Sequence, residues 1–129
     1  GVEVKVIAGA TSRGTKGPVT VEPTDARYFD LTLPDGSAFE EPLGSEFAGF
    51  VVVHAGAIAF PDGSDVGALG LAELGAGDAV RFTAKSGTAR VLVIAGKPIR
   101  EPVAWHGPFV MNTRDELVAA FEDYQAGRF

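Results

Sequence analysis

Few residues in this sequence are suited to nucleophilic, redox or metal chemistry. It contains no cysteine and two histidines, His54 and His106. Without cysteine the chain has no thiol nucleophile, no disulfide and no thiolate metal site. A serine–histidine–aspartate arrangement would have to use one of these two histidines, and no serine lies in a G-x-S-x-G turn. The sequence also lacks a G-x-x-x-x-G-K-[ST] phosphate loop and an H-E-x-x-H zinc motif.

The two histidines lie in contexts typical of structural side chains. His54 falls in a predicted strand three residues after Val51, which favours a structural or barrel-lining role over metal binding. His106 lies between Trp105 and Gly107, as expected for a loop histidine packed beside an aromatic ring. A metal site that used both would need carboxylates from distant segments. We therefore expect no metal ligand and no catalytic residue in this chain.

The chain is acidic, with a formal net charge of -6 at pH 7. Nucleic acids and anionic membranes repel such a surface unless basic residues gather on one face, and no basic stripe is present. We expect neither as a direct partner. Glu40, Glu41 and Glu46 form an acidic group, for which a solvated loop is favoured over a weak cation site because the spacing is irregular.

Alternation of apolar and polar residues, which is typical of strands with one buried face, dominates the sequence. It occurs in residues 2–6, 29–33 and 80–82. Denser apolar runs at residues 50–53 and 91–94 predict strands covered on both faces. Turn signals rich in Gly, Pro and Asp lie at residues 34–36, 61–63 and 75–78, and a Lys-Ser-Gly turn at 85–87. Many short strands with regular turns predict an all-β sandwich or barrel.

One helix is predicted, over about residues 114–125. Thr113 can act as its N-cap, and Glu116 three residues later completes a capping box. Gly127 is placed to end the helix. The apolar residues recur at helical spacing on one face: Leu117, Val118, Phe121 and Tyr124. We expect this face to pack against the barrel or against a partner domain.

The length of 129 residues predicts one domain over 1–129. No apolar run approaches the roughly 18 residues of a membrane span, and no signal peptide is recognisable. Together with the lack of cysteine, this favours a cytoplasmic location. Because the chain begins with Gly1 and its only methionine is Met111, we expect it to be a piece of a longer protein.

The glycine spacing fits the first motif of small metal-binding jelly-roll barrels of the cupin type. That motif reads Gly, five residues, His-x-His, three or four residues, Glu, six residues, Gly, and here Gly36 and Gly56 take the glycine positions. Imidazole and carboxylate donors are required at the ligand positions. This sequence has none there: the positions hold Pro42, Gly44 and Gly49, with Val80 at the histidine of the second motif. The frame is present without its metal ligands.

The end of the chain carries the most specific pattern. Residues 101–103 read Glu-Pro-Val, 107–113 read Gly-Pro-Phe-Val-Met-Asn-Thr, and 120–129 read Ala-Phe-Glu-Asp-Tyr-Gln-Ala-Gly-Arg-Phe. This closely resembles the C-terminal signature of the pirin family. Residues 6–9 and 91–98 also resemble that family. The resemblance covers the whole chain, as the second of two cupin barrels.

The pirin resemblance implies an all-β fold, a cupin-type double-stranded β-helix (jelly-roll barrel) with one C-terminal α-helix. It implies that iron is bound in an N-terminal barrel of the parent by three His and one Glu, which are not in this sequence, and that this chain has no cofactor. It also implies that the parent is a quercetin 2,3-dioxygenase-like enzyme or a transcriptional co-regulator.

Three hypotheses for the function follow. In the first, the chain is a non-catalytic structural and interaction module that packs against the N-terminal cupin of the same parent. The candidate interdomain contacts are Trp105, Phe109, Leu117, Phe121 and Tyr124. In the alternative, it is a free-standing cupin that binds a small apolar ligand. The candidate barrel-lining residues are then Val51, Val53, His54, Val80 and Phe82. An independent enzyme is a third, least supported hypothesis.

Overall fold

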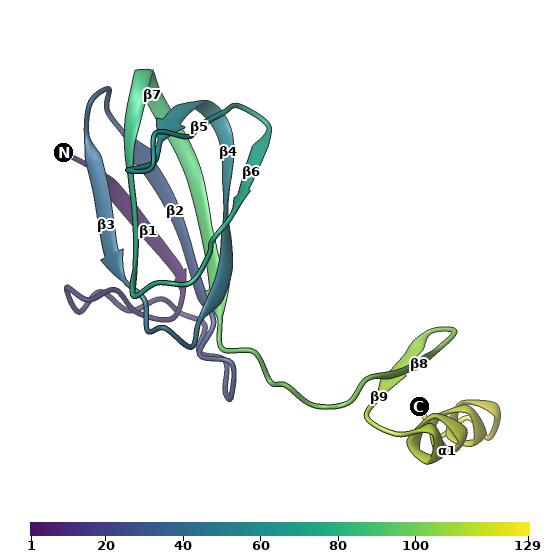
Figure 1. Cartoon of the computed structure of the whole chain (residues 1–129). Coiled ribbons are helices and arrows are strands. Elements are labelled where there is room, and N and C mark those ends of the chain that lie inside the picture. Colours follow the sequence, from purple (N-terminus) through teal and green to yellow (C-terminus); the bar gives the residue numbers. More distant parts are fainter. The chain divides into compact units, whose positions relative to one another are not determined.

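The computed structural model describes all 129 residues, and its contacts divide the chain into two compact units, Gly1–Pro98 and Ile99–Phe129. The single domain predicted for residues 1–129 stays a prediction. The first unit contains seven strands (Figure 1): β1 (Glu3–Ala8), β2 (Arg27–Leu33), β3 (Ala38–Pro42), β4 (Ala48–Ala59), β5 (Asp65–Gly67), β6 (Gly70–Glu73) and β7 (Ala79–Gly96). The second unit contains β8 (Ala104–His106), β9 (Phe109–Met111) and α1 (Arg114–Gln125).

The first unit is a sheet that folds back on itself into two layers, because β4 and β7 each belong to both (Figure 1). The start of β7, residues 79–83, pairs with β3, and its end, residues 89–95, pairs with β2. In β4, residues 50–53 pair with β6 and residues 57–59 pair with β5. All of these pairings are antiparallel. The all-β class with one C-terminal helix is confirmed.

Glycine allows β4 to bend between the layers. Gly56 has a φ of +71°, and a Cβ atom at this position would lie 2.4 Å from the carbonyl oxygen of Thr88. In β7 the turn predicted at residues 85–87 is a bend within one long strand rather than a break between two. Ser86 and Gly87 have φ values of 62° and 111° there, so the strand changes direction and continues.

The core lies between the two layers and is built from the inward face of each strand. Alternation along β2 and the start of β7 buries every second residue, as the period of two predicted. The runs at residues 50–53 and 91–94, predicted as strands covered on both faces, bury only alternate residues, and the residues between these are half-buried. Burying one such side chain contributes about 1.5–3 kcal/mol relative to leaving it exposed. The largest fully buried side chains are Phe29, Phe82, Leu31, Leu33, Ile58, Val51, Val53, Val91 and Val93.

The second unit is a β-hairpin, β8–β9, joined to α1. The predicted capping box is present: Glu116 N donates to Thr113 Oγ1 at 3.2 Å, and Thr113 N donates to Glu116 Oε2 at 3.1 Å. Gly127 follows the helix with a φ of +69°. The small core of this unit consists of Phe109, Leu117 and Ala120. No helix of the chain is long and apolar enough to cross a lipid bilayer.

Candidate functional site

Three of the four positions that carry metal ligands in the cupin frame line one cavity of about 360 Å³. It lies between the β3–β4 and β6–β7 connections. Gly44, Gly49 and Val80 line it, while Pro42 ends β3 beside it in the sequence. The remaining wall is largely apolar and includes Leu43, Phe47, Phe60 and Leu74. The fold therefore brings the frame positions together, although they hold no donor side chains.

The residues present do not fit a metal ion at this cavity. A Cβ atom on Gly49 would lie 2.6 Å from the carbonyl oxygen of Ile94 and 2.8 Å from Cβ of Ala95, so a larger side chain needs the backbone to move. Nowhere in the chain do three or more His, Cys, Asp or Glu side chains lie close enough together to hold a metal.

The residues expected to line the barrel lie on two different faces of the strands. Val51, Val53, Val80 and Phe82 point inward and are 0–2% exposed, so they fill the interior themselves. Whether a ligand enters among them stays a prediction. His54 does not line the interior, because alternation turns it to the opposite face from Val53. It is exposed there, with its Nε2 atom 4.0 Å from Asp30 Oδ1.

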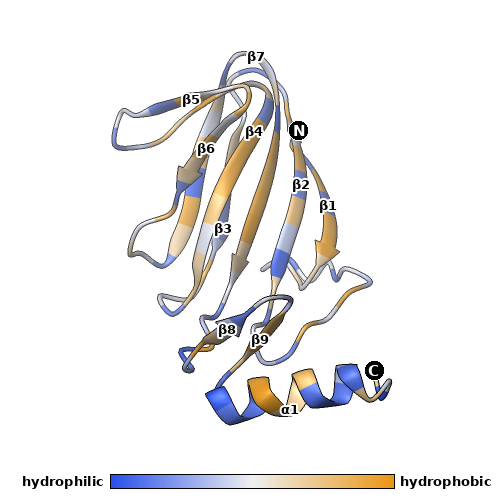
Figure 2. Cartoon of the chain, turned by 90° about the vertical axis from the view of Figure 1, so that its right-hand side faces the viewer, coloured by the Kyte–Doolittle hydropathy of each residue, from blue (hydrophilic) through white to orange (hydrophobic).

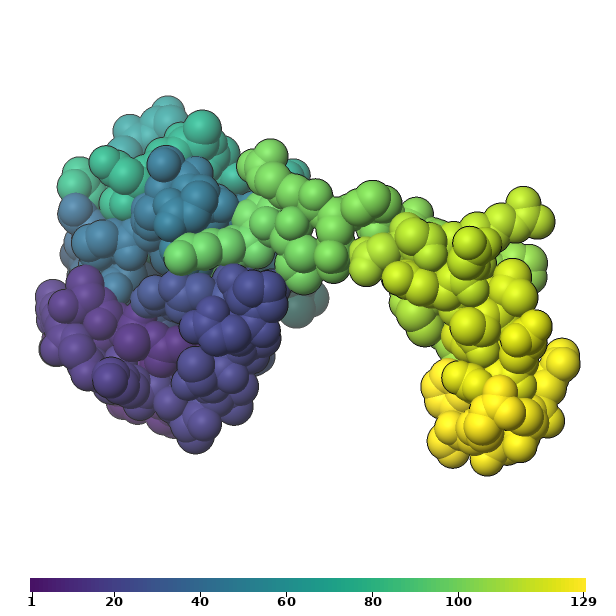
Figure 3. Space-filling view, turned by 90° about the horizontal axis from the view of Figure 1, so that it is seen from below, coloured from purple at the N-terminus to yellow at the C-terminus, as the bar shows by residue number.

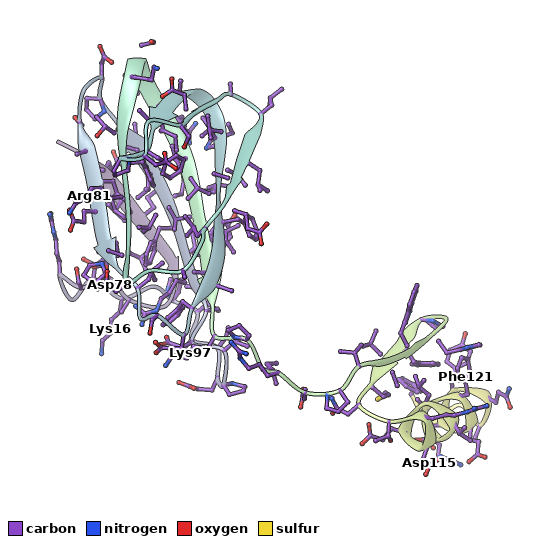
Figure 4. All side chains as sticks on the ribbon, in the orientation of Figure 1. Lys16, Asp78, Arg81, Lys97, Asp115 and Phe121 are labelled. Carbon is purple, nitrogen blue, oxygen red and sulfur yellow. The ribbon has the colours of Figure 1, made fainter.

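Glu40, Glu41 and Glu46, which are close in the sequence, have different surroundings in the folded chain. Glu40 points outward from β3 and accepts a hydrogen bond at 2.7 Å from Nε of Arg81, which is labelled in Figure 4. This bond lowers the pKa of Glu40 and raises that of Arg81. Glu46 lies 3.6 Å from Lys97 Nζ, whereas Glu41 is buried. The three carboxylates therefore form no common cation site.

A charged network lies around the ring of Phe47. The cationic groups of Arg27 and Lys97 each lie 5.4 Å from the ring centroid. Both also contact Asp25 Oδ2, Arg27 at 3.0 Å and Lys97 at 3.7 Å. The hydrogen bond from Arg27 is the largest effect that lowers the pKa of Asp25, and the positive charges of Arg27 and Lys97 lower it further.

The outward face of the β6–β4–β7 layer is apolar. Its residues were not among the candidates predicted from the sequence. Phe50 pairs with Ile94, and Val52 pairs with both Leu92 and Leu71. Leu71 is 59% exposed and the other four are half-buried. Figure 2 shows the hydrophobic colouring of β4 and the adjoining end of β7. The signal in the sequence was the unbroken apolar run at residues 50–53 and 91–94. We name these five residues the outer apolar face.

The candidate interdomain residues of the second unit separate into buried and exposed groups. Phe109 and Leu117 are 9% and 7% exposed and form the small core of this unit, with Phe121 packed against them (Figure 4). Trp105 and Tyr124 are 74% and 64% exposed. His106 packs edge-on against Phe121, with a centroid distance of 5.5 Å, rather than against its neighbour Trp105. Exposed aromatic side chains of this kind are typical of contact surfaces.

A family model described as the pirin C-terminal cupin domain matches residues 28–129. The chain is 51% identical to a pirin-like protein of Caulobacter vibrioides over 129 residues, which is all of this chain and 46% of that protein. It is 40% identical to Pirin-1 of Arabidopsis thaliana, over 97% of this chain and 45% of that protein.

A crystal structure of quercetin 2,3-dioxygenase from Acinetobacter baumannii superposes with a TM-score of 0.83 at 30% identity, covering all of this chain and 44% of that one. The match supports the predicted cupin jelly-roll type of fold. The chain spans about half the length of the curated relatives that it matches.

Proposed function

The chain belongs to the family of pirin C-terminal cupin domains, and we propose that it is a metal-free structural and interaction module that supports an N-terminal iron-binding cupin of the same parent protein. Its relatives have more than half of their length outside the matched region, which provides room for such a partner domain. The ligand positions Pro42, Gly44, Gly49 and Val80 favour a supporting rather than a metal-binding role.

The outer apolar face is the observation that carries this proposal. An antiparallel sheet with one face toward water normally alternates apolar and polar residues. Here β4 and β7 carry apolar residues on both faces, and pairs such as Phe50–Ile94 place them side by side. A contiguous apolar surface on a folded domain is typical of a protein interface. We propose that the other half of the parent covers it.

The exposed side of the second unit is proposed as a further contact. Trp105 lines a surface cavity of about 550 Å³ with Leu117, Val118 and Phe121. Trp and Tyr are enriched at interfaces because they combine a large apolar area with a polar atom. Trp105 and Tyr124 thus remain our candidate contact residues. Phe109 and Leu117 are buried and form the core of the unit that presents them.

The activity of the parent is proposed from its relatives. One similar structure is that of a quercetin 2,3-dioxygenase, so we propose dioxygen-dependent oxidation of a flavonol for the parent, with transcriptional co-regulation as the other role implied by the family. The chemistry then belongs to the N-terminal half, and this chain contributes no reacting group. We place this function in the cytoplasm.

The size of the native polypeptide tests the proposal first, by immunoblotting and peptide mass spectrometry of the source cells. We expect a species about twice the 13.4 kDa of this chain, in keeping with the 46% of the Caulobacter relative that the chain matches. A native species of 13.4 kDa would exclude the supporting role.

A pair of variants then tests whether the outer apolar face is an interface in the native protein. Leu71→Glu in the native protein should lower its melting temperature, because a charge would enter the proposed interface. Leu69→Glu is the matched control, since Leu69 is 91% exposed and lies outside the outer apolar face. In the 129-residue chain alone, Leu71→Glu should change the free energy of unfolding by no more than about 0.5 kcal/mol. Equal effects of the two variants in the native protein would contradict an interface here.

The cavity of about 360 Å³ favours a second candidate function, a free-standing cupin that binds a small apolar ligand. Phe47, Phe60, Leu74 and Val80 would contact such a ligand at the cavity. Val51, Val53 and Phe82 are buried in the core and do not line this cavity. A ligand that binds the native state raises the melting temperature by mass action. Saturable thermal shifts with small apolar compounds, combined with a native mass of 13.4 kDa, would favour this function over the first.

A further inference from the structure

The outer apolar face contains a hollow of about 400 Å³, at the end where β4 begins and β7 stops. Three large side chains of that face line it: Phe50, Leu71 and Ile94. Apart from Glu73, its other lining residues are small: Ala48, Gly49 and Ala95. Viewed from below, the blue segment that leads into β4 lies beside the green end of β7 (Figure 3). The surface is therefore hollowed between large apolar side chains.

Glu73 is the one charged residue that lines this hollow. It is exposed and lies directly opposite Phe50 in the pairing of β6 with β4, so their Cβ atoms are about 4.5–5.5 Å apart. No cationic group of the chain lies within ion-pair distance of Glu73. By contrast, Asp30 on the outward side of β2 lies 3.8 Å from Arg90. The hollow thus combines apolar walls with one unpaired acidic group.

A long basic side chain has the chemistry that matches such a hollow. Lysine and arginine lay their aliphatic part along apolar surface and keep the charged group at its edge. A cationic group within about 6 Å of an aromatic ring is also attracted to its face, and Phe50 supplies a ring beside Glu73. An acidic side chain would be repelled by Glu73, while an apolar one would cover this carboxylate without giving it a partner.

We propose that the hollow holds a basic side chain, of lysine or arginine, from the N-terminal half of the parent. Its aliphatic part contacts Phe50, Leu71 and Ile94, and its cationic group pairs with Glu73. This inference rests on the proposed function, in which that half covers the outer apolar face, and it names the group that anchors the contact. More than half of the Caulobacter relative lies outside the matched region, and a chain of net charge -6 is complementary to a basic group on its partner.

Thermal unfolding of Glu73→Gln, in the native protein and in the 129-residue chain, tests the ion pair. In the native protein this variant should lower the melting temperature by about 2–4 °C, because a charged hydrogen bond at the interface is lost. In the 129-residue chain the melting temperature should stay the same or rise slightly, because Glu73 has no partner there and the net charge of -6 is reduced. Glu73→Lys should lower the melting temperature of the native protein further, since two positive charges would then meet.

Two further variants separate the charge from the shape of the hollow. Glu22→Gln is the matched control, because Glu22 is also exposed, lies outside the hollow and should act alike in both proteins. Ala48→Leu changes no charge and places a larger side chain in the hollow. It should lower the melting temperature of the native protein by displacing the aliphatic part of the basic side chain, and leave that of the 129-residue chain unchanged because Ala48 is exposed.

Equal effects of Glu73→Gln in the two proteins would overturn the inference. If Leu71→Glu lowers the melting temperature of the native protein while neither Glu73 variant does, the interface stands and the basic anchor is excluded. If none of these variants lowers it, the proposed covering of the outer apolar face fails as well. Carbodiimide joins a carboxylate to a lysine amine but not to a guanidinium group, so peptide mass spectrometry of the cross-linked native protein distinguishes lysine from arginine.

Discussion

The α-carbon of Gly56 faces the carbonyl oxygen of Thr88 so closely that a Cβ atom would come within 2.4 Å of it. The contact joins the bend of β4 to the bend of β7, the two strands that belong to both layers. Because the obstacle is backbone rather than a flexible side chain, it cannot rotate away. This close approach explains why the glycine of the cupin frame is needed at this position.

Gly56→Ala should therefore be strongly destabilising. The positive φ of +71° costs an L-residue about 1–2 kcal/mol, and the clash with Thr88 adds to this cost. Gly63→Ala is the matched control, because Gly63 has a φ of +88° with no atom within 4 Å of its added Cβ. Urea unfolding of both variants measures the difference. If Gly63→Ala lowers stability as much as Gly56→Ala, the close approach is not responsible.

The network around Asp25 should make stability depend on pH in the acidic range. The hydrogen bond from Arg27 holds the pKa of Asp25 below its ordinary value in the folded chain, and the charges of Arg27 and Lys97 lower it further. A lowered folded-state pKa stabilises the folded chain above the pKa of the unfolded chain, about 3.9, and this stabilisation is lost as the pH falls through the folded-state value.

Asp25→Asn isolates this contribution, since Asn tolerates the positive φ of 46° at this position. The difference in free energy of unfolding between the unmodified chain and the variant should be largest above about pH 5 and should shrink as the pH falls toward about 2. Chemical denaturation at a series of pH values measures it. A difference that is constant over this range would show that the ionised carboxylate is not responsible.

The cavity at the cupin frame positions should retain no metal. The purified chain, incubated with excess Fe²⁺ and desalted, should contain iron far below one equivalent, because Pro42, Gly44, Gly49 and Val80 offer no donor atom. Treatment with EDTA should leave the melting temperature unchanged, since only a bound metal stabilises the native state. Stoichiometric iron by plasma mass spectrometry would contradict this expectation and reopen the hypothesis of an independent enzyme.

The sequence was sufficient to predict the helix, β1, β2 and parts of β4 and β7, because their signals are local, whereas the short strands β3, β5, β6, β8 and β9 were not predicted. The alternation at residues 29–33 and the capping box of Thr113 and Glu116 each depend on a few neighbouring residues. The continuity of β7 was not predictable in the same way. A Lys-Ser-Gly turn signal looks the same whether the strand ends or bends, and only pairing with β2 and β3 decides which occurs.

The surroundings of two candidate residues were likewise not predictable from the local sequence. Val53 and His54 are adjacent in the sequence and were both candidates for lining the barrel, but alternation in β4 places them on opposite faces. Glu41 was grouped with Glu40 and Glu46 because they are close in the sequence, but it is buried and accepts a hydrogen bond from Ser12, which is 29 residues away. Contacts of this length are set by the fold rather than by the local pattern.

Two adjacent valines on β4, Val52 and Val53, allow the contribution of the outer apolar face to stability to be compared with that of the core. Val53 is 0% exposed, and Val53→Ala should cost about 2–3 kcal/mol through lost burial and a cavity. Val52 is half-buried on the opposite face, and Val52→Ala should cost less than about 1 kcal/mol in the 129-residue chain. If the other half of the parent covers the outer apolar face, the two methyl groups of Val52 are fully buried in the native protein. The loss of stability caused by Val52→Ala should then rise toward that caused by Val53→Ala. Thermal and urea unfolding of both variants, in the short chain and in the native protein, measure the change. A cost of Val52→Ala that is the same in both proteins would mean that this face stays in contact with water.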